Sequence, residues 1–166
     1  GGYVGVETGE NLQHIGINTT LIEAAPNILT PFDSEMANFL EIELVLNKIN
    51  LMTNKKVVEF EEKNEKIFIH LEDGEKVESD IVILSIGVVP DTAFLKDSGI
   101  QLGTKGHILV NDNLETNIKG IYAAGDSILV KNYITVQKSA IPLSGPANRQ
   151  GRIAARKIAR RRETFQ

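Results

Sequence analysis

The chain has 166 residues, of which 42% are hydrophobic, a formal net charge of −4 and no cysteine. This composition is ordinary for a globular protein of one or two small domains, and it excludes disulfide bonds and thiol chemistry within the chain. The weak negative charge gives no overall attraction to nucleic acid, and no apolar run approaches the length of a membrane span. We therefore expect a protein that acts on neither nucleic acid nor membranes, and its expected location is the cytoplasm.

The first residues, GGYVGVE, match most of the G-x-G-x-x-G fingerprint of dinucleotide-binding proteins. Gly2 and Gly5 take the second and third glycine positions, and Gly1 takes the variable position before Gly2. A glycine at the second position lets the backbone approach a pyrophosphate, and one at the third lets the helix pack closely against the strand. The match places the first glycine and its strand upstream of Gly1.

The residues that follow extend the fingerprint. We predict a helix over 4–16 and a strand over 19–23 that ends in Glu23, 21 positions after Gly2. A carboxylate about 20 residues after the glycines hydrogen-bonds the ribose 2′-hydroxyl of NAD. Ala24 follows, with no arginine beside it to accept a 2′-phosphate, so the pattern favours NADH over NADPH. The alternative is a glycine-rich turn with a chance surface glutamate.

The next segments predict a second helix and a meander. Asp33 or Ser34 fits a helix N-cap, and the helix is expected to reach about residue 47. Residues 55–77 alternate in short runs around turns, as in an antiparallel meander. The second-helix residues expected to face the core are Met36, Phe39, Leu40 and Val45 or Leu46.

A continuous apolar run, IVILSI, occupies residues 81–86 and ends at Gly87. Such a run is typical of a strand buried on both faces of a parallel sheet. Ligands of open α/β sheets lie beyond the carboxyl ends of the strands. We therefore expect Gly87 and Val88 to contact the dinucleotide, and the alternative is a tight turn without a ligand.

The second half of the chain is richer in turns. Short strands are predicted over 108–110 and 121–124, and the second ends at Gly125 and Asp126. By itself, this pattern predicts only a carboxylate at a strand end near a ligand.

The final helix is expected over 144–161. Ser144 fits the cap and Pro146 the first turn, whose N–H groups could stabilise an anion. The arginines of this helix recur at helical spacing, as on a solvated face. The three histidines of the chain show no metal-ligand spacing, so we expect no metal site.

These motifs, in this order, resemble those of the pyridine nucleotide-disulfide oxidoreductases, flavoproteins with two dinucleotide-binding domains. The opening and the run IPLSGPANRQGRIAA at 141–155 are most similar to the branch of coenzyme A disulfide reductases and NADH oxidases or peroxidases. The resemblance implies an α/β fold. A three-layer Rossmann-like NAD(P)-binding domain, with a parallel sheet and an antiparallel meander, would span 1–95, and the C-terminal half of an FAD-binding domain would span 96–166.

The resemblance also implies roles for individual residues. Asp126 would bind the ribityl chain of the flavin, while Leu143 and Ser144 would face its ring. Tyr3 would act as a gate between the flavin and the nicotinamide pocket. Glu7 would lie near the nicotinamide carboxamide, and the alternative for Glu7 is a solvated helix residue. The full set expected to bind cofactor is Gly1, Gly2, Tyr3, Val4, Gly5, Glu7, Glu23, Ala24, Gly87, Val88, Gly125, Asp126, Leu143 and Ser144.

The implied activity is hydride transfer from NADH to FAD and then to a disulfide, as in a coenzyme A disulfide reductase. The alternatives are an NADH oxidase or peroxidase, or a non-catalytic NADH-binding redox sensor. The family's first FAD glycine motif, redox cysteine and dimerisation domain have no counterpart in this sequence, so we expect an inactive fragment without a catalytic residue. Its parent would be a homodimer that uses NADH and a small-molecule disulfide, oxygen or peroxide.

Overall fold

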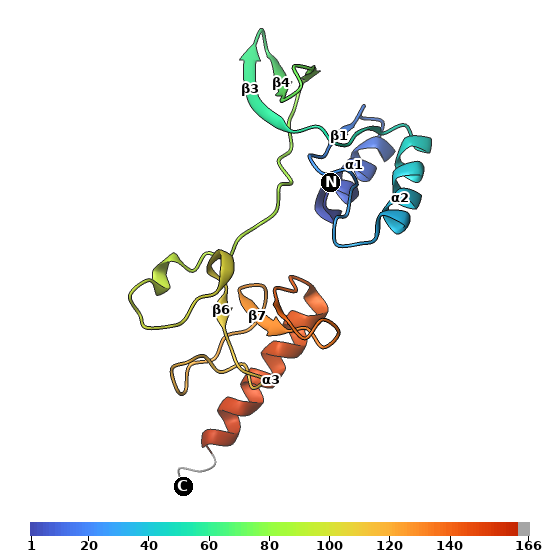
Figure 1. The fold of residues 1–166 in the computed structure, drawn as a ribbon. Coiled ribbons are helices and arrows are strands. Elements are labelled where there is room, and N and C mark those ends of the chain that lie inside the picture. Colours follow the sequence, from blue (N-terminus) through green and yellow to red (C-terminus); the bar gives the residue numbers. More distant parts are fainter. Residues whose placement is uncertain (163–166) are drawn as a thin grey trace. The chain divides into compact units, whose positions relative to one another are not determined.

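The computed structural model describes the backbone of residues 1–162 and the side chains of residues 1–159 (Figure 1). The chain divides into two compact units, Gly1–Gly87 and Val88–Gln166. Each unit has its own cluster of buried apolar side chains. The division falls before the expected boundary at 95/96, and the assignment of either unit to a particular cofactor remains a prediction.

The N-terminal unit begins with a repeated helix-and-strand pattern. Its elements are α1 (Tyr3–His14), β1 (Thr20–Ile22), α2 (Ser34–Leu46) and β2 (Asn50–Met52). Strands β1 and β2 pair in parallel, with Leu21 opposite Leu51. Parallel strands need a crossover connection, and α2 supplies it. Both predicted helices and the first strand are confirmed, whereas β2 is an element that the sequence analysis does not include.

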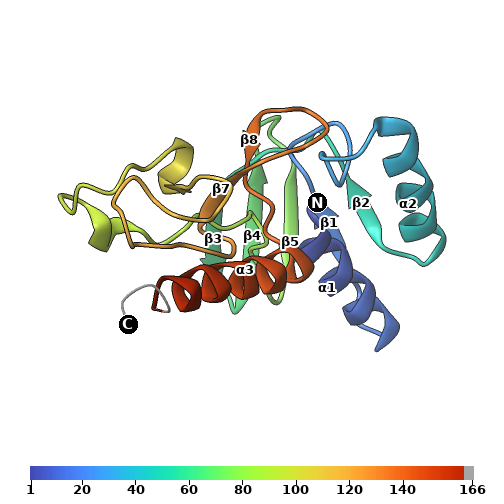
Figure 2. The ribbon, with the colours of Figure 1, turned by 90° about the horizontal axis from the view of Figure 1, so that it is seen from below.

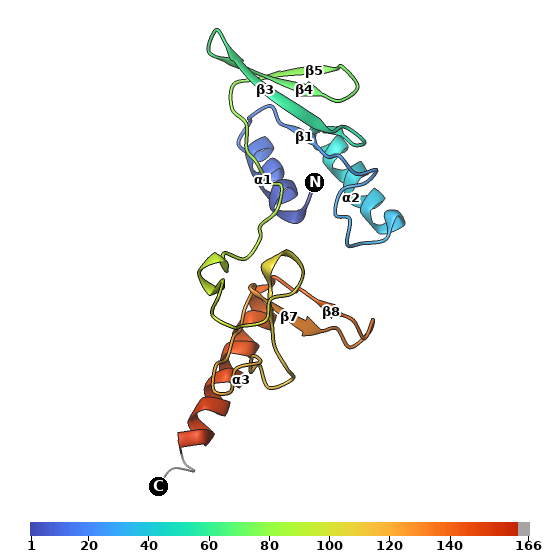
Figure 3. The same ribbon diagram turned by 60° about the vertical axis from the view of Figure 1, so that its left-hand side comes forward.

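A three-stranded antiparallel meander completes this unit. It consists of β3 (Val57–Lys63), β4 (Lys66–Leu71) and β5 (Lys76–Ser79), in the order β3-β4-β5. Ile69 and Leu71 of β4 are buried, with 4% and 3% of their surface exposed. Figures 1 and 3 show β1 between this meander and the helices α1 and α2. The structure thus confirms the meander expected over 55–77.

The run at 81–86 differs from its prediction, because the structure places it in neither a strand nor a helix. Ile81 and Leu84 are 76% and 64% exposed. The run nevertheless lies near α1, since a Cβ built on Gly5 would be 3.3 Å from the Cβ of Ser85. A buried strand needs a neighbour for its backbone hydrogen bonds. Among the residues that the structure describes, no strand pairs with this run.

Most of the buried positions of the two helices in the N-terminal unit hold small residues. Gly5 and Gly9 are the buried residues of α1, and Ala37 and Leu44 are those of α2. The assignment of larger α2 side chains to the core is wrong, because α2 is apolar around most of its circumference and spacing does not select one face. The residues misassigned to the core, all at least 45% exposed, are Met36, Phe39, Leu40, Val45 and Leu46.

Over residues 88–162, the C-terminal unit has two short 3₁₀ helices, three short strands and one long helix. They are η1 (Ala93–Leu95), η2 (Thr104–Gly106), β6 (Ile108–Leu109), β7 (Ile128–Lys131), β8 (Lys138–Ser139) and α3 (Ser144–Arg162). Strand β7 pairs in parallel with β6 and antiparallel with β8. Ala154 of α3 belongs to the same buried cluster as Ile128 of β7, and Figure 2 shows α3 running along this unit.

The strand expected over 121–124 is wrong as well. This segment forms only an isolated bridge between Glu115 and Tyr122, because no further strand pairs with it in the described part of the chain. Strands β7 and β8 are elements that the sequence analysis does not include. No helix among residues 1–162 is long and apolar enough to cross a membrane.

Candidate nucleotide site

Glu23 lies immediately after β1, with its side chain 20% exposed. Its Oε1 accepts a hydrogen bond from the backbone N–H of Ala25 at 2.7 Å, and its Oε2 lies 2.9 Å from the amino group of Gly1. Partial burial pushes the pKa of Glu23 upwards, but the hydrogen bonds that the carboxylate accepts, first of all from the Ala25 N–H, outweigh it, so the pKa lies below its usual value. The carboxylate is therefore ionised at neutral pH, and its two oxygens retain lone pairs for a further donor.

The glycines at the start of α1 differ in the space around them. A Cβ built on Gly1 would lie within 3 Å of the Glu23 side chain, so only glycine fits there without a shift. A Cβ built on Gly2 would meet nothing within 4 Å, which leaves the backbone open to solvent. On Gly5 it would come 3.3 Å from Ser85 and 3.6 Å from Leu21 of β1. Gly1 and Gly5 thus permit close packing, and Gly2 faces open space.

The segment after β2 runs beside the Glu23 loop. The N–H of Lys55 donates to the carbonyl of Glu23 at 3.0 Å, and the N–H of Asn54 donates to the carbonyl of Ala25 at 2.9 Å. The N–H of Glu23 in turn donates to Met52 at 2.9 Å. These backbone bonds extend the β1–β2 ladder past the strand ends and hold the loop that carries the carboxylate.

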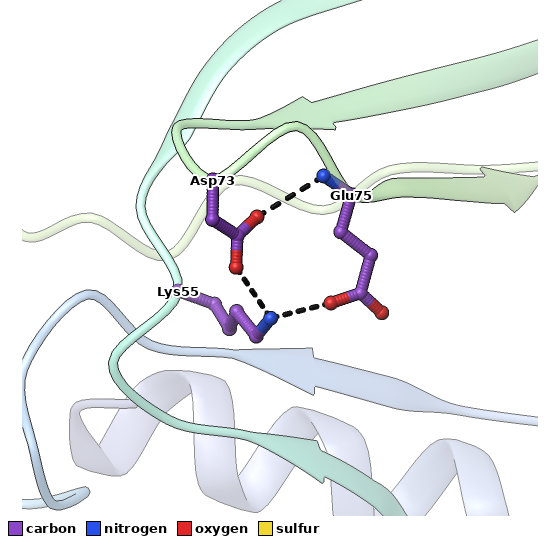
Figure 4. A network of polar contacts seen from close by, with 3 residues as sticks. All are labelled: Lys55, Asp73 and Glu75. Carbon is purple, nitrogen blue, oxygen red and sulfur yellow. Dashed lines mark hydrogen bonds and ion pairs between the residues drawn. The ribbon is translucent and has the colours of Figure 1, made fainter.

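Lys55 also connects this segment to the meander (Figure 4). Its Nζ lies 2.5 Å from the Asp73 carboxylate and also bonds Glu75, on either side of the turn between β4 and β5. The N–H of Glu75 donates to Asp73 at 3.1 Å, which closes the three-residue network. Hydrogen bonds to Asp73 and Glu75 raise the pKa of Lys55, and the bond from Lys55 lowers that of Asp73.

Most of the other predicted residues of this unit lie on α1 or beside Glu23. Tyr3 and Val4 occupy the first turn of α1 and are 46% and 58% exposed. Glu7 is exposed, one turn further along α1, beside a shallow depression of about 430 Å³. Ala24 is exposed next to Glu23. Gly87, at the end of the unit, has a positive φ of 93° that favours glycine.

In the C-terminal unit, Gly125 and Asp126 form a turn before β7. Gly125 has a φ of 88°, and its N–H donates to the side-chain oxygen of Gln150 on α3 at 2.8 Å. Asp126 is exposed beside it. Gln150 therefore ties the Asp126 turn to α3, a connection that sequence reasoning misses because the residues are distant in the chain.

Leu143 and Ser144 lie at the N-terminal end of α3. Leu143 is 50% exposed and Ser144 is the first helical residue. The N–H of Ala147 donates to the carbonyl of Leu143 at 3.1 Å, as expected at the start of a helix. Val88, the first residue of the C-terminal unit, is 86% exposed.

Two separate groups of predicted residues thus emerge, one in each unit. The first surrounds the start of α1 and contains Glu23, and the second surrounds Asp126 and the start of α3. Three residues that these groups bond or approach, Ser85, Lys55 and Gln150, received no site role from the sequence. Over residues 1–159, no cluster of three or more histidine, aspartate or glutamate side chains could hold a metal ion.

A glycine-rich helix start, a carboxylate after the next strand and a parallel crossover together define a Rossmann-like α/β unit. The sequence profile of the pyridine nucleotide-disulphide oxidoreductases matches residues 1–151. The chain belongs to this family.

Proteins with different electron acceptors resemble the chain to a similar degree. It is 32% identical to an NAD(P)H sulfur oxidoreductase (CoA-dependent) of Pyrococcus furiosus and 36% identical to a coenzyme A disulfide reductase of Staphylococcus aureus, over 95% of its length in both cases. It also matches a water-forming NADH oxidase of Lactobacillus brevis bound to NADH, with a TM-score of 0.88 and 30% identity over 95% of its length. The chain spans only 36%, 35% and 35% of these three proteins, respectively.

Proposed function

We propose that this chain is the NADH-binding and flavin-facing part of an FAD-dependent NADH:disulfide oxidoreductase of the coenzyme A disulfide reductase type. The observation that carries the proposal is the ionised carboxylate of Glu23 beside the glycine-rich start of α1. A carboxylate there accepts hydrogen bonds from a ribose and repels a 2′-phosphate. The expected cofactors are therefore NADH and FAD.

The residues around α1 suit a dinucleotide. The open space at Gly2 admits a pyrophosphate, and the first turn of α1 presents N–H groups and a partial positive charge to it. Glu23 would hold the adenosine ribose, with Ala24 alongside. Tyr3, Val4 and Glu7 would lie towards the nicotinamide, and Gly87 and Val88 would border the same ligand.

The residues around α3 suit a flavin. Asp126 offers a carboxylate to a polyol, and Gln150 holds the turn from which it extends. Leu143 and Ser144 would face the ring, and the positive end of α3 would favour negative charge there. The flavin, when bound, supplies hydride acceptance, while these residues bind and orient it.

The family assignment does not specify the electron acceptor, so a disulfide acceptor is part of this proposal. The similarity to a coenzyme A disulfide reductase supports it, and the similarity to a water-forming NADH oxidase supports oxygen as the second candidate. A cytoplasmic location and a homodimeric parent are further parts of the proposal that rest on the resemblance alone.

The test is a fluorescence titration of the chain with NADH and with NADPH. We expect saturable NADH binding that Glu23→Ala weakens at least about tenfold, because a hydrogen bond to a charged group is worth about 1.5–3 kcal/mol. Glu10→Ala, which removes an exposed carboxylate elsewhere on α1, is the matched control and should leave the affinity unchanged. Equal affinity of the parent chain and Glu23→Ala for NADH would overturn the assignment of Glu23.

A further inference from the structure

We infer that Lys55 is a positioning residue for nucleotide recognition: it anchors the Glu23 loop to the meander turn and thereby sets the preference for NADH over NADPH. This inference rests on the proposed function of Glu23 as the ribose-binding carboxylate. Lys55 is not expected to touch the nucleotide, since its Nζ is already bonded to Asp73 and Glu75.

A backbone hydrogen bond joins Lys55 directly to Glu23. Lys55 donates its N–H to the carbonyl of Glu23, so the main chain of one residue fixes that of the other. The neighbouring bond from Asn54 to Ala25 fixes the residue whose N–H holds the Glu23 carboxylate. Movement of Lys55 therefore changes both the backbone and the side chain of Glu23.

The side chain of Lys55 attaches this segment to the meander turn. β2 ends at Met52 and β3 begins at Val57, so Lys55 lies in a connection outside any strand. Such a connection keeps one conformation only if further contacts hold it. The bonds from Lys55 to Asp73 and Glu75 supply such contacts, with the Lys55 side chain 26% exposed.

Lys56 reinforces the same attachment. Its Nζ lies 2.8 Å from the Glu72 carboxylate, and its carbonyl accepts the N–H of Glu72 at 2.9 Å. Two successive lysines therefore bind three acidic residues of one turn. Because Lys56 and Glu72 are 61% and 63% exposed, their ion pair is the weaker of the two attachments.

The experiment compares NADH and NADPH binding by Lys55→Met and Lys66→Met. Lys66 also pairs with two carboxylates of the meander, Asp80 at 2.5 Å and Glu78 at 3.8 Å, but at the opposite end of β4 from the turn. We expect Lys55→Met to weaken NADH binding about two- to fivefold and to lower the NADH:NADPH preference. Lys66→Met should change neither, and Lys55→Arg should restore both.

A double variant separates positioning from direct contact. Asp73→Asn with Glu75→Gln breaks the same attachment from the other side, so it should weaken NADH binding in the same direction as Lys55→Met. If Lys55 instead contacts a phosphate, releasing it from its carboxylates would tighten binding and overturn the inference.

Hydrogen exchange provides a readout without nucleotide. We expect the amides of Ala25 and Lys55 to exchange faster in Lys55→Met than in Lys66→Met. The Ala25 N–H donates to the side chain of Glu23 and the Lys55 N–H donates to its carbonyl, so both bonds weaken when the Glu23 loop is released. Unchanged exchange together with an unchanged nucleotide preference overturns the role of Lys55. If Lys55→Met has no effect but Glu23→Ala weakens NADH binding, the ribose assignment stands and the Lys55 inference fails. If Glu23→Ala has no effect on NADH binding either, the proposed function itself is rejected.

Discussion

Several charged side chains of the N-terminal unit act in groups of three. Besides the Lys55 network, Glu61 lies 3.0 Å from Lys76 and 3.1 Å from His70. Hydrogen bonds with Lys76 and His70 lower the pKa of Glu61. Single exposed ion pairs contribute little to stability, but these groups connect all three strands of the meander and the segment that leads into it.

The acid stability of the meander follows from these groups. The pKa values of Asp73 and Glu61 lie below their ordinary values of 3.8 and 4.5 in the folded chain. Their contribution to stability is therefore present above those ordinary values and is lost as the pH falls through the lower folded values. We expect urea midpoints, followed by circular dichroism, to be similar at pH 7 and pH 5 and to fall at pH 3.

Removing the positive partner isolates this effect. In Lys55→Met the Asp73 carboxyl loses the bond that lowers its pKa, so the midpoint should fall less between pH 5 and pH 3 than in the parent chain. An equal fall in both proteins would mean that other groups determine the acid sensitivity.

Helix α1 approaches its strand through glycines, and this determines how the helix tolerates substitution. A Cβ at Gly9 would lie 3.6 Å from the Cγ2 of Thr19, an ordinary contact distance, whereas at Gly5 it would be crowded by Ser85 at 3.3 Å. Comparing alanine substitutions at Gly5 and Gly9 therefore distinguishes the effect of helix propensity from the effect of packing within one helix.

We predict that Gly9→Ala raises the free energy of unfolding by about 0.5–1 kcal/mol, because alanine loses less conformational entropy than glycine in a helix. Gly5→Ala should gain less, since crowding against Ser85 offsets the same benefit. Chemical denaturation of both variants tests this difference. If Gly5→Ala raises the free energy of unfolding as much as Gly9→Ala does, residues 81–86 move away from the new methyl group without a cost in stability.

At the scale of the whole molecule, the two units differ in charge as well as in fold. Residues 1–87 contain 16 acidic and 6 basic residues, whereas residues 88–166 contain 6 acidic and 12 basic residues. The residues on either side of the division, Ile86 and Val88, are 89% and 86% exposed. No strand or helix includes residues 81–92.

Limited proteolysis should therefore cut the chain first within this exposed segment. Exposed backbone without secondary structure is the preferred site of cleavage. We expect one acidic and one basic fragment, separable by ion exchange and identifiable by mass. First cuts within β4 or α3 would contradict the division into two units.

The family and most helices could be predicted from the sequence, because glycine spacing, caps and apolar periodicity are local features. The meander was also predictable from alternation around turns. The unpaired state of residues 81–86 was not, because an apolar run indicates a strand only if another strand lies beside it. Likewise, α2 has apolar residues around most of its circumference, so its sequence did not reveal that Ala37 and Leu44 would be its buried residues.

The sequence by itself determined the glycine-rich helix start and the carboxylate that follows the first strand, since both depend on spacing along the chain, and the order of all its motifs indicated the family. Only the tertiary structure decided that Lys55 supports Glu23 and that Gln150 holds the turn of Asp126. These contacts join residues from separate elements. Their geometry depends on how the chain folds back on itself, which no local pattern specifies.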